Sequence, residues 1–316
     1  MTQFLVNRLL AMLVTAVAVS IVAILVIHAV PGNIVQQMLG QLGAGSPEAR
    51  ATLEHFFGID RPLYVQYWDW LTELSHGSLG QSWNQGTPVT GLLLNAFAVT
   101  LELTLLSLAF ALVLGSCLGL LASMWRGTLL DVAIQAFNVL GLSLPAFWVG
   151  AMALVVASNV AGWGPPLFYS GPFSSPADNF QIMALPVLSL GLFNAAAISQ
   201  FVRDLVDTVV RHDYVRTAVA KGVAHRRVFF KHVFRNILIP LTSFSGVILV
   251  GILGGAVAIE SVFNLPGIGR LLLWAIETRD YPVLQGGIFL VAIITLIINL
   301  VIDLLYAAID PRVTYA

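Results

Sequence analysis

Long uncharged apolar stretches alternate with short polar connections along most of this chain. The first stretch, residues 9–30, is long enough to cross a bilayer as a helix. Five more apolar stretches follow, and they lie at residues 97–124, 132–160, 182–202, 237–259 and 283–302. Pro145 interrupts the third stretch and Pro186 lies within the fourth, where proline breaks or kinks a helix. The pattern predicts six transmembrane helices.

A polar region of about sixty residues separates the first two predicted spans. Ser46 is a suitable N-cap for a short helix that has Pro47 at its first position. A second helix is predicted over residues 62–74, where apolar side chains recur at helical spacing. We therefore divide the chain into an N-terminal transmembrane helix (1–32), an external cap segment (33–95) and a five-helix transmembrane core (96–316).

Composition agrees with a membrane protein and excludes an ordinary soluble domain. Hydrophobic residues make up 58% of the chain and charged residues only 10%, and the mean hydropathy is +0.88. A soluble domain has roughly a quarter charged residues. The single cysteine, Cys117, excludes an intramolecular disulfide. The expected fold class is an all-α polytopic membrane protein.

Basic residues are concentrated in one predicted loop, residues 203–236, which holds 8 of the 15 lysines and arginines. With six spans, Arg8, Arg126 and Arg312 lie on the same side as this loop, whereas only four arginines lie on the opposite side. An excess of basic residues marks the cytoplasmic face. We expect both termini and the loop to be cytoplasmic and the cap to be external.

The sequence lacks the motifs that are typical of catalytic and metal-binding sites. The histidines lack paired metal-ligand spacing. Gly141-Leu142-Ser143 resembles part of a nucleophile elbow but lacks its second glycine. Neither Lys221 nor Lys231 follows a Gly-rich turn and precedes Ser or Thr, so a P-loop is missing. We expect a non-enzymatic chain that does not hydrolyse ATP alone, has no metal site and binds no nucleic acid.

Acidic residues near the spans and paired glycines favour structural roles. Glu102, Glu260 and Asp303 lie within a turn or two of predicted span ends, where capping or buried hydrogen bonds explain them. No span has a central acid–base chain, which weakens an ion-driven mechanism. The patterns Gly115-x-x-x-Gly119 and Gly251-x-x-x-Gly255 fit close helix packing, either within the chain or in a dimer.

The basic loop contains a short predicted helix, residues 214–221. Asp213 is a plausible N-cap, and Gly222 can end the helix in the left-handed conformation. Part of the helix surface carries small side chains, namely those of Thr217, Ala218 and Ala220. Larger side chains around this part can contact a neighbouring protein; they are Tyr214, Arg216 and Lys221. Two interpretations remain at this point: a signal that fixes membrane topology, or a surface that another protein grips.

Residues 214–222, Tyr-Val-Arg-Thr-Ala-Val-Ala-Lys-Gly, with Arg235-Asn236 and Pro240 after them, resemble the EAA loop of ABC importer permeases. Arg-Thr-Ala stands where the general signature has Glu-Ala-Ala. Further segments resemble the dipeptide, oligopeptide and nickel group of these permeases in the same order. They are Ile59-Asp60-Arg61-Pro62-Leu63, Leu142-Ser143-Leu144-Pro145-Ala146-Phe147-Trp148, residues 260–270 with Arg279-Asp280-Tyr281-Pro282, Asp303-Leu304-Leu305-Tyr306, and Asp310-Pro311-Arg312. The resemblance thus extends along nearly the whole chain.

This resemblance implies a type I ABC importer permease in a bacterial or archaeal cytoplasmic (inner) membrane. Its implied partners are a second related permease, two ABC ATPase subunits that bind ATP and Mg, an extracytoplasmic solute-binding protein and the lipid bilayer. The chain itself would hold no cofactor. The residues implied to couple it to the ATPases are Asp213, Tyr214, Arg216, Thr217, Ala218, Ala220, Lys221 and Gly222.

The pathway and its cargo are less specified by the sequence. We expect the third to fifth spans to form pathway walls, and the residues suggested for them are Ser143, Phe147, Asn194 and Ser199. The group resemblance favours short peptides as cargo. Nickel or a metal–metallophore complex is the first alternative, followed by glutathione- or opine-like solutes. A self-sufficient ion-coupled secondary transporter is the alternative from a different class.

Overall fold

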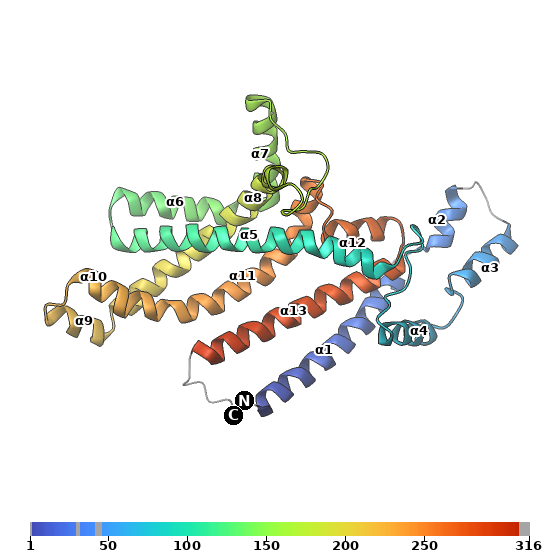
Figure 1. Ribbon diagram of the computed structural model, residues 1–316, viewed down its shortest axis with the longest axis horizontal. Helices are drawn as coiled ribbons and strands as arrows, with labels where there is room; N and C mark the ends of the chain where they lie inside the picture. The colour runs from blue at the N-terminus through green and yellow to red at the C-terminus, as the bar shows by residue number, and fades with distance from the viewer. Residues whose placement is uncertain (1, 30–31, 42–45, 310–316) are drawn as a thin grey trace. The chain divides into compact units, whose positions relative to one another are not determined.

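The computed structural model describes residues 2–29, 32–41 and 46–309. Within these ranges the chain is helical, apart from turns, loops and one isolated bridge between Gln81 and Pro88. The helices (Figure 1) are α1 Thr2–Ala29, α2 Ile34–Gln41, α3 Pro47–Phe56, α4 Leu63–Ser75, α5 Val89–Met124, α6 Leu129–Ser143, α7 Ala146–Ala161, α8 Pro176–Val210, α9 Asp213–Ala220, α10 His225–Val228, the π-helix Phe229–Phe234, α11 Arg235–Val262, α12 Ile268–Glu277 and α13 Tyr281–Ile309. The predicted all-α fold class is confirmed. The motif at 310–312 lies outside the described residues.

Five of the described helices are long and apolar enough to cross a membrane, and α6 with α7 would form a sixth span. These two helices meet at an angle of 101°, and Figure 1 shows α7 turning sharply away from α6. Pro145 disfavours helical geometry at the preceding residue, and Leu144 is accordingly extended, with φ −95° and ψ 130°. The predicted interruption at this proline is therefore confirmed, and it is a sharp bend.

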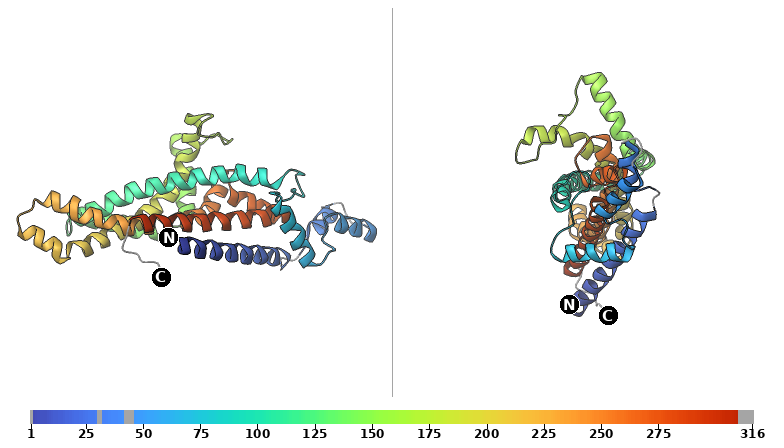
Figure 2. Two further views of the ribbon diagram at one scale, coloured as in Figure 1. Left: turned by 60° about the horizontal axis from the view of Figure 1, so that its bottom comes forward. Right: turned by 90° about the vertical axis from the view of Figure 1, so that its right-hand side faces the viewer.

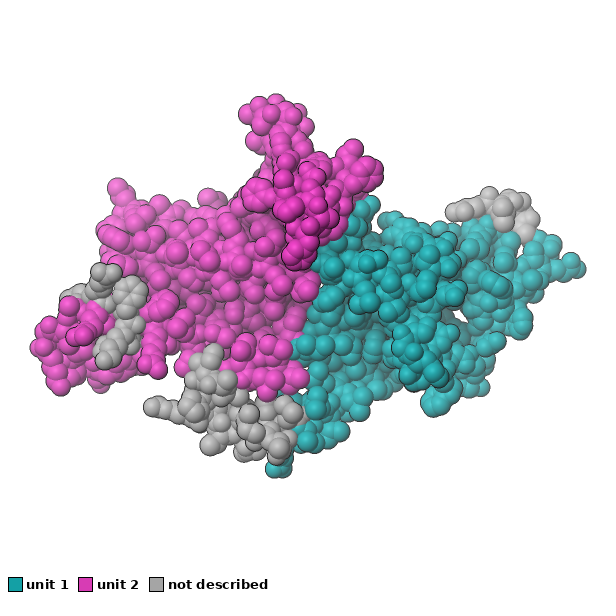
Figure 3. Space-filling model, in the orientation of Figure 1, with its two compact units in different colours: residues 1–99, 266–297, 315 teal, residues 100–265, 298–314, 316 magenta. Residues whose placement is uncertain are grey.

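The chain divides into two compact units (Figure 3). The first comprises residues 1–99 and 266–297, and the second comprises residues 100–265 and 298–314, with the last two residues assigned one to each. In the first unit, the helix expected at residues 46–57 is observed as α3, and the Ser46 hydroxyl accepts a hydrogen bond from the Ala49 amide at 3.2 Å. The second expected cap helix is α4. Helices α2 and α12 were not predicted.

The second unit is organised around α8, which is buried along much of its length and contacts α6, α7 and α11. One face of α5 carries residues with small side chains, and this face packs on α8. A Cβ atom on Gly119 would lie 2.5 Å from the Ser199 carbonyl oxygen, and one on Gly115 would lie 2.6 Å from that of Ala195. This glycine pair therefore serves packing within the chain. At Gly251, in contrast, a Cβ atom would meet no atom within 4 Å.

Gly119→Leu is expected to separate α5 from α8, because the new side chain would overlap backbone as well as Val202. The expected result is loss of the monodisperse peak in fluorescence-detected size-exclusion chromatography and a marked fall in the melting temperature. Gly251→Leu is the matched control, since it adds the same side chain to another membrane helix where space is open. Equal behaviour of the two variants would contradict the packing assigned to Gly119.

Candidate functional site

Helix α9 is the predicted contact for the ATPases, and it follows α8 after a two-residue turn. Val215 is its buried residue, with 3% of its surface exposed, and it belongs to a cluster with Val228, Val233 and Ile237. Figure 2 shows the short helices α9 and α10 at one end of α8 and α11. Val215, with the partly buried Ala218 packed against the same cluster, attaches α9 to the unit, and most of the helix surface remains exposed.

The C-terminal end of α9 confirms the predicted role of Gly222, whose φ is +75°. The Gly222 amide donates to the Val219 carbonyl at 2.9 Å, and the Val223 amide donates to the Ala218 carbonyl at 3.2 Å. These two bonds form a Schellman motif, which requires a left-handed residue at this position. The helix end is therefore fixed by backbone hydrogen bonds.

The predicted N-cap of α9 is wrong. Helix α9 begins at Asp213, and the capping position belongs to His212, which makes no side-chain cap hydrogen bond. Asp213 lies in the first turn, where a carboxylate still interacts favourably with the helix dipole. The helix is therefore displaced by one residue from the predicted range.

A second contact ties α9 to the start of α11. The Asn236 amide donates to the Tyr214 hydroxyl at 3.2 Å. The Tyr214 ring also stacks on His212, with ring centroids 5.6 Å apart. Helix α9 is therefore held at two positions, by the packing of Val215 in its cluster and by the hydrogen bond between Tyr214 and Asn236.

The eight predicted coupling residues lie close together, on α9 and the turn that follows it. Seven of them are exposed, and only Ala218 is half-buried; the exposed ones are Asp213, Tyr214, Arg216, Thr217, Ala220, Lys221 and Gly222. The arrangement is a compact exposed surface on a short, well-terminated helix. No described contact tests whether an ATPase binds it, so the coupling role stays a prediction.

Two ion pairs join the C-terminal part of α8 to the turn after α5 and the first turn of α6. Arg126 Nη1 lies 2.7 Å from Asp207 Oδ2. Arg203 Nη2 lies 3.2 Å from Asp131 Oδ2, which also accepts a hydrogen bond from the Gly127 amide at 3.0 Å. The second pair is the more buried, with 9% of the Asp131 side chain exposed. Sequence analysis missed this pair, because its members lie 72 positions apart.

The four residues suggested for the pathway are not brought together. Ser143 and Phe147 are exposed on either side of the α6–α7 bend, whereas Asn194 and Ser199 are buried on α8. The Asn194 amide donates to the Leu190 carbonyl at 2.7 Å, a bond within its own helix. A pathway role for these four residues stays a prediction.

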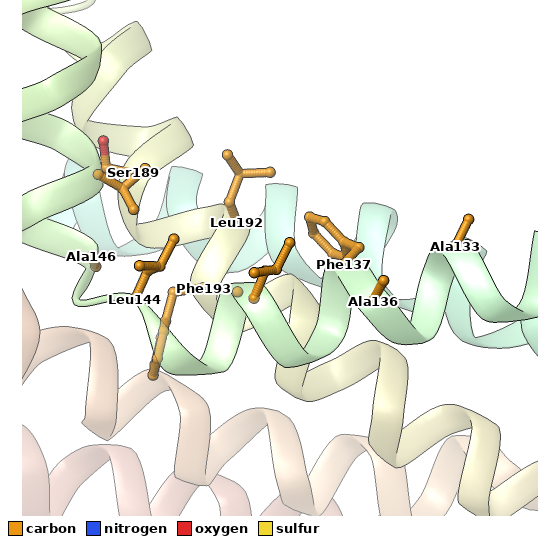
Figure 4. A pocket seen from close by; sticks show the side chains of 11 residues that line it. Ala133, Ala136, Phe137, Leu144, Ala146, Ser189, Leu192 and Phe193 are labelled. Carbon is orange, nitrogen blue, oxygen red and sulfur yellow. The ribbon is translucent and has the colours of Figure 1, made fainter.

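An apolar cavity of about 500 Å³ lies beside the α6–α7 bend. Its walls come from α6, α7 and α8 and include Phe137, Leu144, Leu192 and Phe193. In Figure 4, the Ser189 hydroxyl is the only side-chain oxygen among the residues drawn. None of the four suggested pathway residues lines this cavity. Such a surface offers apolar contact and little hydrogen bonding.

The acids near span ends have hydrogen-bonded roles. Glu260 is fully buried, and its Oε1 accepts a hydrogen bond from Thr100 at 2.6 Å. Glu102 Oε2 accepts one from the Tyr169 hydroxyl at 2.5 Å. Burial, together with this hydrogen bond, raises the pKa of Tyr169, so the phenol stays a neutral donor. The predicted buried hydrogen-bond role is confirmed for Glu260, and the hydrogen bond of Glu102 is partly buried.

In the first unit, Asp280 organises a polar network that sequence analysis missed. It is fully buried and accepts hydrogen bonds from the Ser82 hydroxyl at 2.5 Å, the Trp83 amide at 3.3 Å and the Asn84 amide at 3.2 Å. Asp280 therefore joins the turn after α4 to the start of α13.

In the same unit, a hydrogen bond from His55 lowers the pKa of the exposed Asp60 carboxyl.

Comparison with known families decides the class of this chain. The family described as "Binding-protein-dependent transport system inner membrane component" matches residues 115–315, and the N-terminal part described for the same membrane component matches residues 1–104. The chain belongs to this family. It is thus an inner membrane permease of the ABC importer class, as the sequence resemblance indicated.

Known relatives extend over the whole chain. The "Glutathione transport system permease protein GsiC" of Escherichia coli strain K12 is 37% identical over 319 residues, with full coverage of both chains. The protein of the same name from Salmonella choleraesuis is 35% identical over 315 residues, again with full coverage of both. These relatives place the permease in the peptide and nickel group.

Solved structures support the type I permease fold. The "MetNI methionine ABC transporter" in an inward facing conformation aligns with a TM-score of 0.57 and 17% identity, over 70% of this chain and 97% of that chain. An "amino acid ABC transporter with histidines" aligns with a TM-score of 0.51 and 14% identity, over 71% and 95%. At these identities the comparison concerns the fold alone.

Proposed function

We propose that this permease forms half of a transmembrane pathway for short peptides, driven by separate ATPase subunits that engage α9. A second, related permease would form the other half, and an external binding protein would deliver the cargo. Both termini and α9 would then face the cytoplasm, in agreement with the eight basic residues of the loop at 203–236. Partner ATPases would bind ATP and Mg.

The observation that carries the coupling proposal is the exposure of α9 together with its attachment. Val215 anchors the helix, and the Schellman motif at Gly222 fixes its end. A rigid short helix with small exposed residues can enter a groove on another protein without a large loss of conformational entropy. A loop that only fixed topology would need its basic residues but not this ordered helix end.

Within the class of short peptides, glutathione is the first cargo to test. The reason is the 37% identity, over the full length of both chains, to permeases of glutathione transport systems. Glutathione is itself a tripeptide, so this cargo is a special case of the peptide proposal. Nickel, metal–metallophore complexes and opine-like solutes are the competing cargoes.

Reconstituted transport tests the proposal. The permease is purified with its co-expressed partners, placed in liposomes with the binding protein, and supplied with labelled glutathione, a labelled dipeptide or radioactive nickel. We expect uptake of a peptide cargo that requires both ATP and the binding protein. Uptake of nickel but neither peptide would replace the cargo assignment. Uptake by the purified chain alone, driven by an ion gradient, would replace the permease mechanism by secondary transport.

A further inference from the structure

The first unit contains a cavity of about 680 Å³ that differs from the apolar one beside α7. It is lined by α1, residues 55–61, α4, residues 78–86 and the first turns of α13. Sites for small organic molecules usually have volumes of about 300–1,000 Å³ and combine apolar walls with a few polar groups. This cavity has that size and that mixture of side chains.

Two buried hydrogen-bond donors lie directly behind the floor of the cavity. Trp70 and Gln285 line it, and only 8% and 7% of their surfaces are exposed. Neither Trp70 Nε1 nor Gln285 Nε2 has a hydrogen-bond partner within residues 2–29, 32–41 and 46–309. The Trp70 ring packs edge-on against Phe289, one turn beyond Gln285 on α13, at 5.4 Å between ring centroids. Both nitrogen atoms have almost no accessible surface, so a ligand acceptor reaches them after a small rotation of the Trp70 and Gln285 side chains. An acceptor such as a carboxylate or a carbonyl would then satisfy both donors.

The rim of the cavity offers an acidic side chain. Glu73 is exposed and lies about one turn beyond Trp70 on α4. Its carboxylate lies beside Gly80, where a Cβ atom would come within 3.2 Å of Glu73 Oε2. Among the described residues Arg61 forms an ion pair with Asp69, at 3.0 Å, and Glu73 forms none. Glu73 is therefore available to bind an ammonium group.

Aromatic rings form a wall between rim and floor. Trp83 lies 5.0 Å from Phe57 and 5.2 Å from Tyr281, measured between ring centroids. The hydrogen bonds from Ser82 and Trp83 to the buried Asp280 hold this wall in place. A wall fixed before a ligand arrives lowers the entropy cost of binding.

We propose that this cavity receives a small zwitterion, namely a short peptide with a free amino group and a free carboxylate, outside the transmembrane pathway. The amino group binds Glu73, and an apolar side chain packs on Trp83 and Tyr281. The carboxylate or a peptide carbonyl accepts from Trp70 and Gln285 once these two side chains have rotated toward the cavity. The choice of a peptide rests on the function proposed above. The volume of the cavity, its two donors, its acidic side chain and its aromatic wall do not depend on that function.

Direct binding to the purified transporter complex in nanodiscs, without binding protein or ATP, tests this site. The probes are radiolabelled Ala-Phe and N-acetyl-Ala-Phe. We expect saturable binding of Ala-Phe, which Glu73→Gln weakens by about tenfold, because one charged hydrogen bond is lost. The same substitution should leave N-acetyl-Ala-Phe binding unchanged, whereas Gln285→Leu should weaken binding of both probes. Glu48→Gln is the matched control, since Glu48 is an exposed glutamate on α3 that does not line the cavity.

Three results would overturn the inference. They are absence of saturable binding to the complex, binding that Glu73→Gln and Gln285→Leu do not change, and binding that appears only when the binding protein is present. The last would mean that the labelled peptide is held by the binding protein and not by the cavity. ATP-dependent peptide uptake by a complex that fails the binding test would remove the cavity proposal and leave the proposed function intact. Nickel as the only cargo would remove the proposed function.

Discussion

Ala220→Trp is expected to lower binding-protein-stimulated ATP hydrolysis of the assembled complex by at least about tenfold, equivalent to about 1.4 kcal/mol of docking free energy. Ala220 is exposed on α9, so the indole adds bulk to the docking surface without disturbing the packing of Val215. Ala218→Glu should act in the same direction by adding charge to the half-buried neighbour. ATPase activity is measured with loaded binding protein, and membrane insertion by immunoblot of the membrane fraction.

Two matched controls separate docking from folding. Leu129→Trp places the same indole at another exposed position, at the start of α6. Gly222→Ala and Gly127→Ala form a second pair, because both glycines have φ near +75° and neither has an atom within 4 Å of an added Cβ. Both alanines carry similar backbone strain, about 1–2 kcal/mol, but only Gly222 ends α9. Normal stimulation in the Ala220, Ala218 and Gly222 variants would exclude α9 as the coupling contact.

Asp131→Ala is expected to destabilise the permease by about 3 kcal/mol, the lower end of the range for breaking a buried ion pair. The substitution leaves Arg203 without its carboxylate, with 20% of the arginine side chain exposed, and removes the acceptor of the Gly127 amide. The free energy of unfolding is measured by SDS titration of the purified protein in mild detergent. Asp131→Asn should cost less, because its side-chain oxygen can still accept from Gly127.

Arg126→Ala is the comparison for this prediction. It breaks a pair of shorter distance, 2.7 Å, but 54% of the Arg126 side chain is exposed. Exposed pairs contribute about 0–1 kcal/mol, since water screens both charges. If Arg126→Ala proved as destabilising as Asp131→Ala, burial would not explain how much each ion pair contributes to the free energy of unfolding.

The order of the membrane helices followed from the sequence, whereas their ends did not. Hydropathy detects the part of a helix that matches the bilayer core. It predicted 182–202 for the fourth span, but α8 extends from Pro176 to Val210, because charged and polar side chains such as Asp204 and Asp207 are compatible with a helix outside the hydrocarbon. For the same reason α5 begins at Val89, eight positions before the predicted start.

The bend between α6 and α7 shows a second limit of sequence reasoning. Pro145 indicates that a helix is interrupted, but not the direction in which the chain continues. That direction depends on packing, and Gly150 of α7 lies against Phe263 and Ser189, which are far away in sequence. Likewise, the composition of α9 suggested a small exposed surface, but only the fold shows that Val215 is the side chain that points inward.

The length of α8 has a mechanical consequence for coupling. Its 35 residues, at about 1.5 Å each, span about 52 Å, which exceeds the hydrocarbon thickness of about 30 Å. Part of this helix must therefore extend beyond the hydrocarbon, and α9 is attached after its last residue. A tilt of α8 by about 5° about one end would displace the other end by about 4–5 Å over that length. Under the coupling role proposed for α9, a small rigid rotation of α8 within the bilayer would displace α9 by a distance comparable to one helical turn.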